Sequence, residues 1–76
     1  MTTEDMVLKA ALDNDWHVKK MPETHNRVYN GWWIRRGAVE ITIAFDKIDG
    51  GMMFAQTRNR EFEGRNEVLE YLKGRP

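Results

Sequence analysis

The most regular segment of the chain reads Val39-Glu40-Ile41-Thr42-Ile43-Ala44-Phe45. Large apolar side chains alternate with small or polar ones along it. A period of two is typical of a β-strand that buries one face. The segment therefore predicts a strand at the centre of a sheet, and the rest of the chain can be interpreted around it.

The neighbouring segments predict further strands. Residues 27–36 place Val28, Trp32 and Ile34 on one face, and Tyr29, Trp33 and Arg35 on the other. Asn30-Gly31 predicts a turn or a bulge within that segment, and Arg36-Gly37 predicts a tight turn after it. Residues 46–51 form a hairpin loop before a strand at residues 52–58, in which Met52/Phe54 and Met53/Ala55 are both acceptable core faces. Residues 16–21 predict a short edge strand, because its two lysines discourage pairing with other chains.

Helices are expected at both ends of the chain. Thr2 or Thr3 can cap a helix over residues 3–14, which the sequence Asp13-Asn14-Asp15 ends. In the last segment, Asn66 is the predicted N-cap, Val68, Leu69 and Leu72 form an apolar stripe, and Gly74 is the predicted stop.

These elements predict an α+β fold. We expect an antiparallel meander of three or four strands with the N- and C-terminal helices packed on one face, in the order α-β-β-β(-β)-α. The fourth strand arises if residues 27–30 are separate from residues 31–36. Residues 1–76 are short enough to form a single small domain. No apolar run approaches the ~20 residues of a membrane helix, and no secretory signal is evident, so we expect a cytoplasmic protein.

The composition argues against catalysis. The chain has 12 Lys and Arg, 12 Asp and Glu, and no Cys. Ser is absent too, so the two commonest nucleophiles are missing. His17 and His25 lack the repeated spacing of zinc ligands. We therefore expect no enzymatic activity, no metal and no cofactor.

The remaining candidates for a functional site are aromatic residues. Alternation turns Trp33 away from Trp32 and toward Tyr29 and Arg35, on a sheet face without helices. Trp, Tyr and Arg are enriched at binding hot spots. The candidate partner-binding residues are Tyr29, Trp33, Arg35, Arg36, Arg58 and Arg60. The alternative is structural, with Trp33 packed beneath the loop at residues 22–26 or against a twisted sheet edge.

The sequence therefore predicts a small non-catalytic interaction module. It would act as a regulatory, inhibitory or accessory protein of bacterial or phage type, binding a protein partner or forming a homodimer. The alternative is a nucleic-acid-binding module that uses Arg and Trp on the open sheet face. The order of elements is similar to that of double-stranded-RNA-binding domains. However, residues 63–67, where that family has a basic cluster, contain one base and two acids, and no membership follows.

The two adjacent tryptophans provide a test of the predicted faces. We expect Trp32→Ala to cost about 3–5 kcal/mol of unfolding free energy as a core truncation, and Trp33→Ala much less. Urea denaturation of both variants measures the difference. The reverse order would mean that the faces are exchanged and that the site moves to Val28, Trp32 and Ile34.

Overall fold

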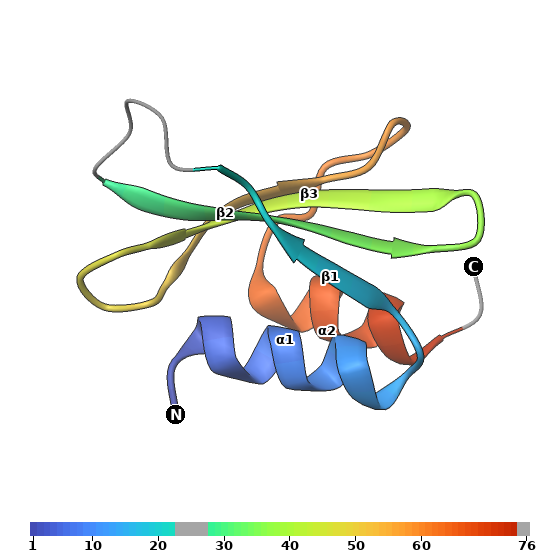
Figure 1. The fold of residues 1–76 in the computed structure, drawn as a ribbon, viewed down its shortest axis with the longest axis horizontal. Helices are drawn as coiled ribbons and strands as arrows, with labels where there is room; N and C mark the ends of the chain where they lie inside the picture. Colours follow the sequence, from blue (N-terminus) through green and yellow to red (C-terminus); the bar gives the residue numbers. More distant parts are fainter. Residues whose placement is uncertain (23–27, 75–76) are drawn as a thin grey trace.

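The structure is a computed structural model that describes residues 1–22 and 28–74. It contains two helices and one antiparallel sheet with the strand order β1-β2-β3-β4 (Figure 1). The elements are α1 (Thr3–Asp13), β1 (His17–Lys20), β2 (Tyr29–Arg36), β3 (Val39–Asp46), β4 (Met52–Gln56) and α2 (Arg65–Lys73). The predicted α+β meander with a helix at each end is confirmed.

The four strands do not depend on a division of residues 27–36, contrary to the prediction. β2 is continuous, so Asn30-Gly31 is neither a turn nor a bulge. The sheet reaches four strands because the predicted edge strand, β1, pairs along β2. Gly31 instead allows close packing of Met21, since a Cβ atom there would lie 2.6 Å from Sδ of Met21. The bulge occurs in β4, where Ala44 pairs with Phe54 and Phe45 with Met52.

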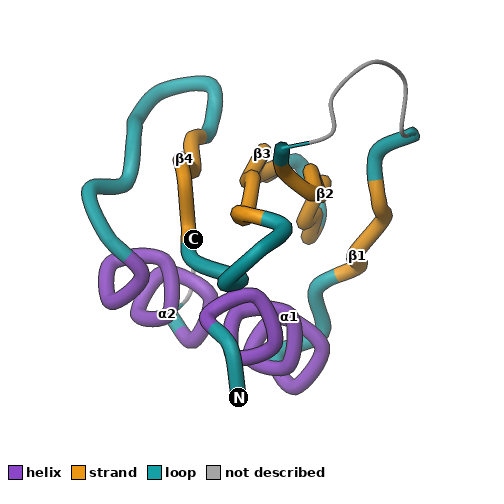
Figure 2. The backbone as a smooth tube through the Cα atoms, turned by 90° about the vertical axis from the view of Figure 1, so that its left-hand side faces the viewer, coloured by secondary structure: helices purple, strands orange, loops and turns teal. Residues whose placement is uncertain are grey.

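Both helices lie on one face of the sheet, as predicted (Figure 2). The core between the layers consists of buried residues from every element except β1, together with two from the connecting segments. They are Val7, Ala11, Trp16, Ile34, Ile41, Ile43, Phe45, Ala55, Phe62, Val68 and Leu72. Trp32 packs against this core and Ile34 lies within it, whereas Val28 precedes β2 and is 59% exposed. The prediction that Val28 shares a strand face with Trp32 and Ile34 is therefore wrong.

Each end of α1 is closed by local hydrogen bonds. Thr2 and Asp5 form a capping box at the start. At the end, Asp15 has φ 65°, and the N–H groups of Asp15 and Trp16 donate to the carbonyls of Leu12 and Ala11. This is the Schellman arrangement, which satisfies carbonyls of the last turn. The predicted termination at residues 13–15 is confirmed.

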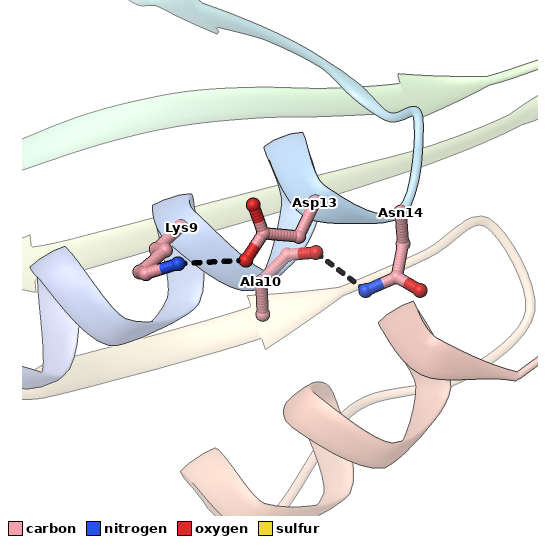
Figure 3. A network of polar contacts seen from close by, with 4 residues as sticks. All are labelled: Lys9, Ala10, Asp13 and Asn14. Carbon is pink, nitrogen blue, oxygen red and sulfur yellow. Dashed lines mark hydrogen bonds and ion pairs between the residues drawn. The ribbon is translucent and has the colours of Figure 1, made fainter.

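Side chains reinforce the last turn of α1 (Figure 3). Lys9 pairs with Asp13 at 2.8 Å, and Asn14 donates its Nδ2 to the carbonyl of Ala10. The hydrogen bond to Asp13, together with the negative charge of that carboxylate, raises the pKa of the Lys9 ammonium above its usual value. The pair is exposed, so its net contribution to stability is small.

The loop after β3 holds the beginning of α1. The backbone N–H of Glu4 donates to the carbonyl of Gly50 at 3.0 Å, and the Glu4 carboxylate accepts from the indole of Trp32 at 2.8 Å. Gly50 has φ 73°, and a Cβ atom there would lie 2.6 Å from Thr2. Both facts favour glycine at this position, because it alone combines that conformation with such a close approach.

α2 begins one residue earlier than its expected cap. Gly64 is the N-cap and makes no side-chain capping bond, so the prediction of Asn66 as the cap is wrong. Glu67 instead holds the segment before the helix, because its carboxylate receives the N–H of Glu63 at 3.2 Å and also pairs with Arg60. The predicted end of the helix at Gly74 is confirmed.

Trp16 and Arg36 join the two layers at one end of the molecule. The guanidinium carbon of Arg36 lies 4.5 Å from the centroid of the Trp16 ring. Arg36 donates to the carbonyls of Asn14 and Gly74 at 2.8 and 2.9 Å, and the Trp16 indole donates to the carbonyl of Leu72 at 2.9 Å. A single positive charge thus lies at the C-terminal, partly negative ends of both helices.

Within residues 1–22 and 28–74, neither helix has the length and apolar character required to cross a membrane.

Arg36 and its sequence neighbour Arg35 provide a matched test of this contact. Arg36→Ala removes two charge-assisted hydrogen bonds and the stack on Trp16, and we expect it to cost about 2–3 kcal/mol of unfolding free energy. Arg35→Ala removes an exposed side chain on the other sheet face and should cost less than about 0.5 kcal/mol. Urea denaturation measures both. Similar losses in the two variants would contradict the assigned role of Arg36.

Candidate functional site

The candidate site is the sheet face opposite the helices, called here the outer face. Tyr29, Trp33 and Arg35 lie on it, because β2 is regular and turns Trp32 and Ile34 toward the core. This half of the predicted site is brought together by the fold. The alternative that Trp33 packs beneath the loop at residues 22–26 falls largely outside the described residues.

Phe54 joins these residues on the outer face. Its ring makes an edge contact with Tyr29, with ring centroids 6.4 Å apart and an interplanar angle of 80°. Tyr29 is on β2 and Phe54 on β4, so the two side chains meet across β3. They can do so because Ala44, the β3 residue paired with Phe54, has only a methyl group. Ala44 is completely buried although it lies on the outer face.

The sequence did not identify Phe54 because the register of β4 was ambiguous. The bulge determines the register: Met52 and Ala55 contribute to the core, and Phe54 lies on the outer face, where it pairs with Ala44. Neither predicted pairing of core residues, Met52/Phe54 or Met53/Ala55, is correct. An extra residue between two core positions gives them a spacing of three, which simple alternation does not allow.

Met21 lies over β2 at Gly31, between the positions of Tyr29 and Trp33. These two side chains are separated on β2 by Gly31, and Met21 packs directly over that glycine. The N–H of Met21 donates to the carbonyl of Gly31 at 2.9 Å, which fixes the approach. We call Met21, Tyr29, Trp33 and Phe54 the aromatic patch. Phe54 is 41% exposed, and the other three side chains are half-buried.

Charges of both signs surround the aromatic patch. The Lys19 ammonium lies 6.0 Å from the centroid of the Trp33 ring. Arg35 is exposed and stands opposite Glu40 on β3, while Asp46 stands opposite Tyr29. The face therefore combines apolar surface with an alternating charge pattern rather than a basic field.

Two predicted arginines belong to the other side of the sheet. Arg36 faces the helices and stacks on Trp16. Arg60 lies 4.5 Å from the centroid of the Phe62 ring and forms an ion pair with Glu67 at 2.7 Å. Neither borders the aromatic patch. Alternation along β2 accounts for Arg36, and the turn after β4 accounts for Arg60.

Arg58 lies neither in the aromatic patch nor among the contacts on the helix side of the sheet. It is exposed in the turn after β4 and lines a groove of about 540 Å³ beside the first residues of β3. Glu40 and Thr42 form the opposite wall, and Tyr71 of α2 also lines the groove. The arginine is thus adjacent to the outer face without touching the aromatic patch.

The side chains of the outer face are suited to binding another molecule through its surface. Among the described residues, no group of three or more His, Asp or Glu side chains is placed to hold a metal ion. The chemical resources of the outer face are ring surfaces, a thioether and exposed charged groups. These can bury apolar area and form hydrogen bonds with another molecule.

In comparisons with known proteins, no family model matches the chain, and neither a curated protein nor a solved structure matches it.

The contact between Tyr29 and Phe54 can be measured by a double-mutant cycle. We expect Tyr29→Ala, Phe54→Ala and the double variant to give a coupling of about 0.5–1.5 kcal/mol in unfolding free energy, because edge contacts between rings have that magnitude. Leu12→Ala with Phe54→Ala is the control pair, since Leu12 is an exposed residue of α1, on the opposite side of the sheet. A Tyr29–Phe54 coupling no larger than the control would exclude the contact.

Proposed function

We propose that this protein is a small non-catalytic interaction module that binds a protein partner, or a second copy of itself, through the aromatic patch and Arg35. The observation that carries the proposal is the placement of Tyr29, Trp33 and Phe54 on the sheet face away from both helices. Aromatic and arginine side chains that lose their solvent on binding supply most of the energy at protein interfaces.

The aromatic patch is prepared for binding by the sheet beneath it. Tyr29 and Trp33 are on a central strand that is paired on both sides. Phe54 is steadied by Tyr29, and Met21 is steadied by its backbone bond to Gly31. Side chains that are already ordered lose less conformational entropy when a partner covers them. A rigid apolar centre with exposed charges around it also matches the usual layout of an interface.

A nucleic-acid partner has less support. That alternative used four arginines around Trp33, and two of them, Arg36 and Arg60, are engaged on the helix side of the sheet. The outer face retains Lys19 and Arg35, but it also carries Glu40 and Asp46. Tight binding of a phosphate backbone requires several neighbouring Lys or Arg side chains, since each contact contributes through the release of a counterion.

The proposal is tested with a variant that removes the centre of the aromatic patch. We expect Trp33→Ala with Phe54→Ala to reduce binding of the native partner, or self-association, by at least about tenfold, because hot-spot truncations cost more than about 1.4 kcal/mol. Quantitative pull-down from the native host identifies a partner, and sedimentation equilibrium measures self-association.

Leu12→Ala is the matched control, because it removes a large exposed side chain, 59% accessible, from α1. It should leave binding unchanged. Equal losses in the two variants would contradict the proposal. A parallel titration with labelled RNA and DNA oligonucleotides at two salt concentrations tests the alternative, which would be favoured by tight binding that falls steeply with salt.

A further inference from the structure

The beginning of β3 has a strand on one side only. β3 spans Val39–Asp46, but its pairing with β4 covers only Thr42 to Phe45. Beyond Gln56 the chain turns away from β3, and this turn is closed by the N–H of Thr57 donating to the carbonyl of Arg60 at 2.8 Å. Residues 39–41 therefore pair with β2 and, within the described part of the chain, with no strand on their other side.

The register identifies which backbone groups face the open side. Lys47 donates its N–H to Val28 on the β2 side, and Asp46 donates its N–H to Gly51 on the β4 side. The pairing of β2 with β3 is unbroken, so neighbouring residues of β3 point alternately to the two sides. Counting back from Asp46 by twos, the N–H and C=O of Glu40 point to the β4 side. In residues 1–22 and 28–74 no hydrogen bond to these two groups is present.

The open groups face a groove. This is the groove of about 540 Å³ between residues 38–42 and residues 56–59, which Tyr71 also lines. Val39 and Tyr71 are half-buried and give it an apolar side on the inner face of the sheet. Glu40 and Arg58, both exposed, place opposite charges on its two walls.

We infer that this groove binds an extended peptide segment of a partner protein, which adds to β3 as a further strand. The backbone of the guest pairs with the N–H and C=O of Glu40, as in other cases of strand addition to a sheet edge. Its inward side chains are apolar and cover Val39 and Tyr71. Its outward side chains include a basic residue opposite Glu40 and an acidic residue near Arg58, because opposite charges on paired strands attract.

This inference is independent of the aromatic patch. The guest pairs with the strand edge, whereas the proposed interface lies on the sheet face. β1, one of the two edge strands of the sheet, is less suited to strand addition because Lys19 and Lys20 lie along it.

A tethered probe tests the inference. The segment Val-Lys-Val-Glu-Val is appended after Pro76 through a flexible Gly-Ser linker of about ten residues. The end of the described chain is close to the groove, since Gly74 accepts a hydrogen bond from Arg36, which pairs with Val39. Tethering raises the effective concentration to about the millimolar range. The matched control replaces the three valines of the probe with prolines, which cannot pair as a strand.

Hydrogen exchange at the Glu40 amide is the primary measurement. We expect exchange to be at least about tenfold slower with the valine tether than with the proline tether, because the bound strand protects that amide. Equal exchange in the two fusions would overturn the inference. The protection should persist in Trp33→Ala with Phe54→Ala, so the inference and the proposed function can fail separately.

Glu40→Pro gives a second, independent measurement. Proline removes the open N–H but no bond between β2 and β3, and strand edges tolerate it in this orientation. We expect the valine tether to raise the melting temperature of the wild-type chain and of Glu40→Gln, but not that of Glu40→Pro. An equal rise in Glu40→Pro would show that the probe binds elsewhere and would overturn the inference. If Glu40→Pro does not fold, exchange in the wild-type chain remains decisive.

Discussion

The stack of Arg36 on Trp16 is the contact on which the rest of the structure depends. It brings the last residue of β2 next to the C-terminal ends of both α1 and α2. The carbonyls of Asn14 and Gly74 need donors there, and one guanidinium supplies both. Because a planar, multi-donor cation can also stack on an indole, arginine meets these requirements together where lysine would not. The helices are thereby held on one face of the sheet.

The same contact determines the character of the opposite face. Once Arg36 and Trp32 point toward the helices, alternation directs Arg35 and Trp33 to the outer face. Two pairs of neighbours with identical side chains thus have different roles. One member of each pair lies between the layers, and the other lies on the outer face. The spacing of β2 leaves no freedom to exchange them, because a shift of one residue would expose Ile34.

Much of the fold could be predicted from local patterns. The alternation of residues 39–45, the capping threonine before α1 and the glycine after α2 act within a few residues, so the sequence contains their signals. The extra residue in β4 could not be predicted, since Met53 and Phe54 are equally suited to a core or an outer position. The role of Arg36 was also hidden, because its acceptors are contributed by helix ends that are remote in the chain.

The candidate site was predictable to the extent that it depends on β2. Tyr29, Trp33 and Arg35 follow from alternation along a single strand, whereas Phe54 depends on how a second strand is aligned with its neighbours. Net charge gave no guidance to the distribution of arginines. An arginine is available to a partner only if it does not already contact carbonyls, rings or carboxylates within the protein, and tertiary packing decides this.

The hydrogen bond between the carbonyl of Gly50 and the start of α1 affects how the helix can unfold. α1 is fastened near its beginning by Gly50 and Trp32, and at its end by Arg36. Fraying of either end must therefore break contacts with residues distant in the sequence, not only the local helical bonds. We therefore expect the N-terminal helix and the sheet to unfold together as one cooperative unit, although the chain is short and has no disulfide.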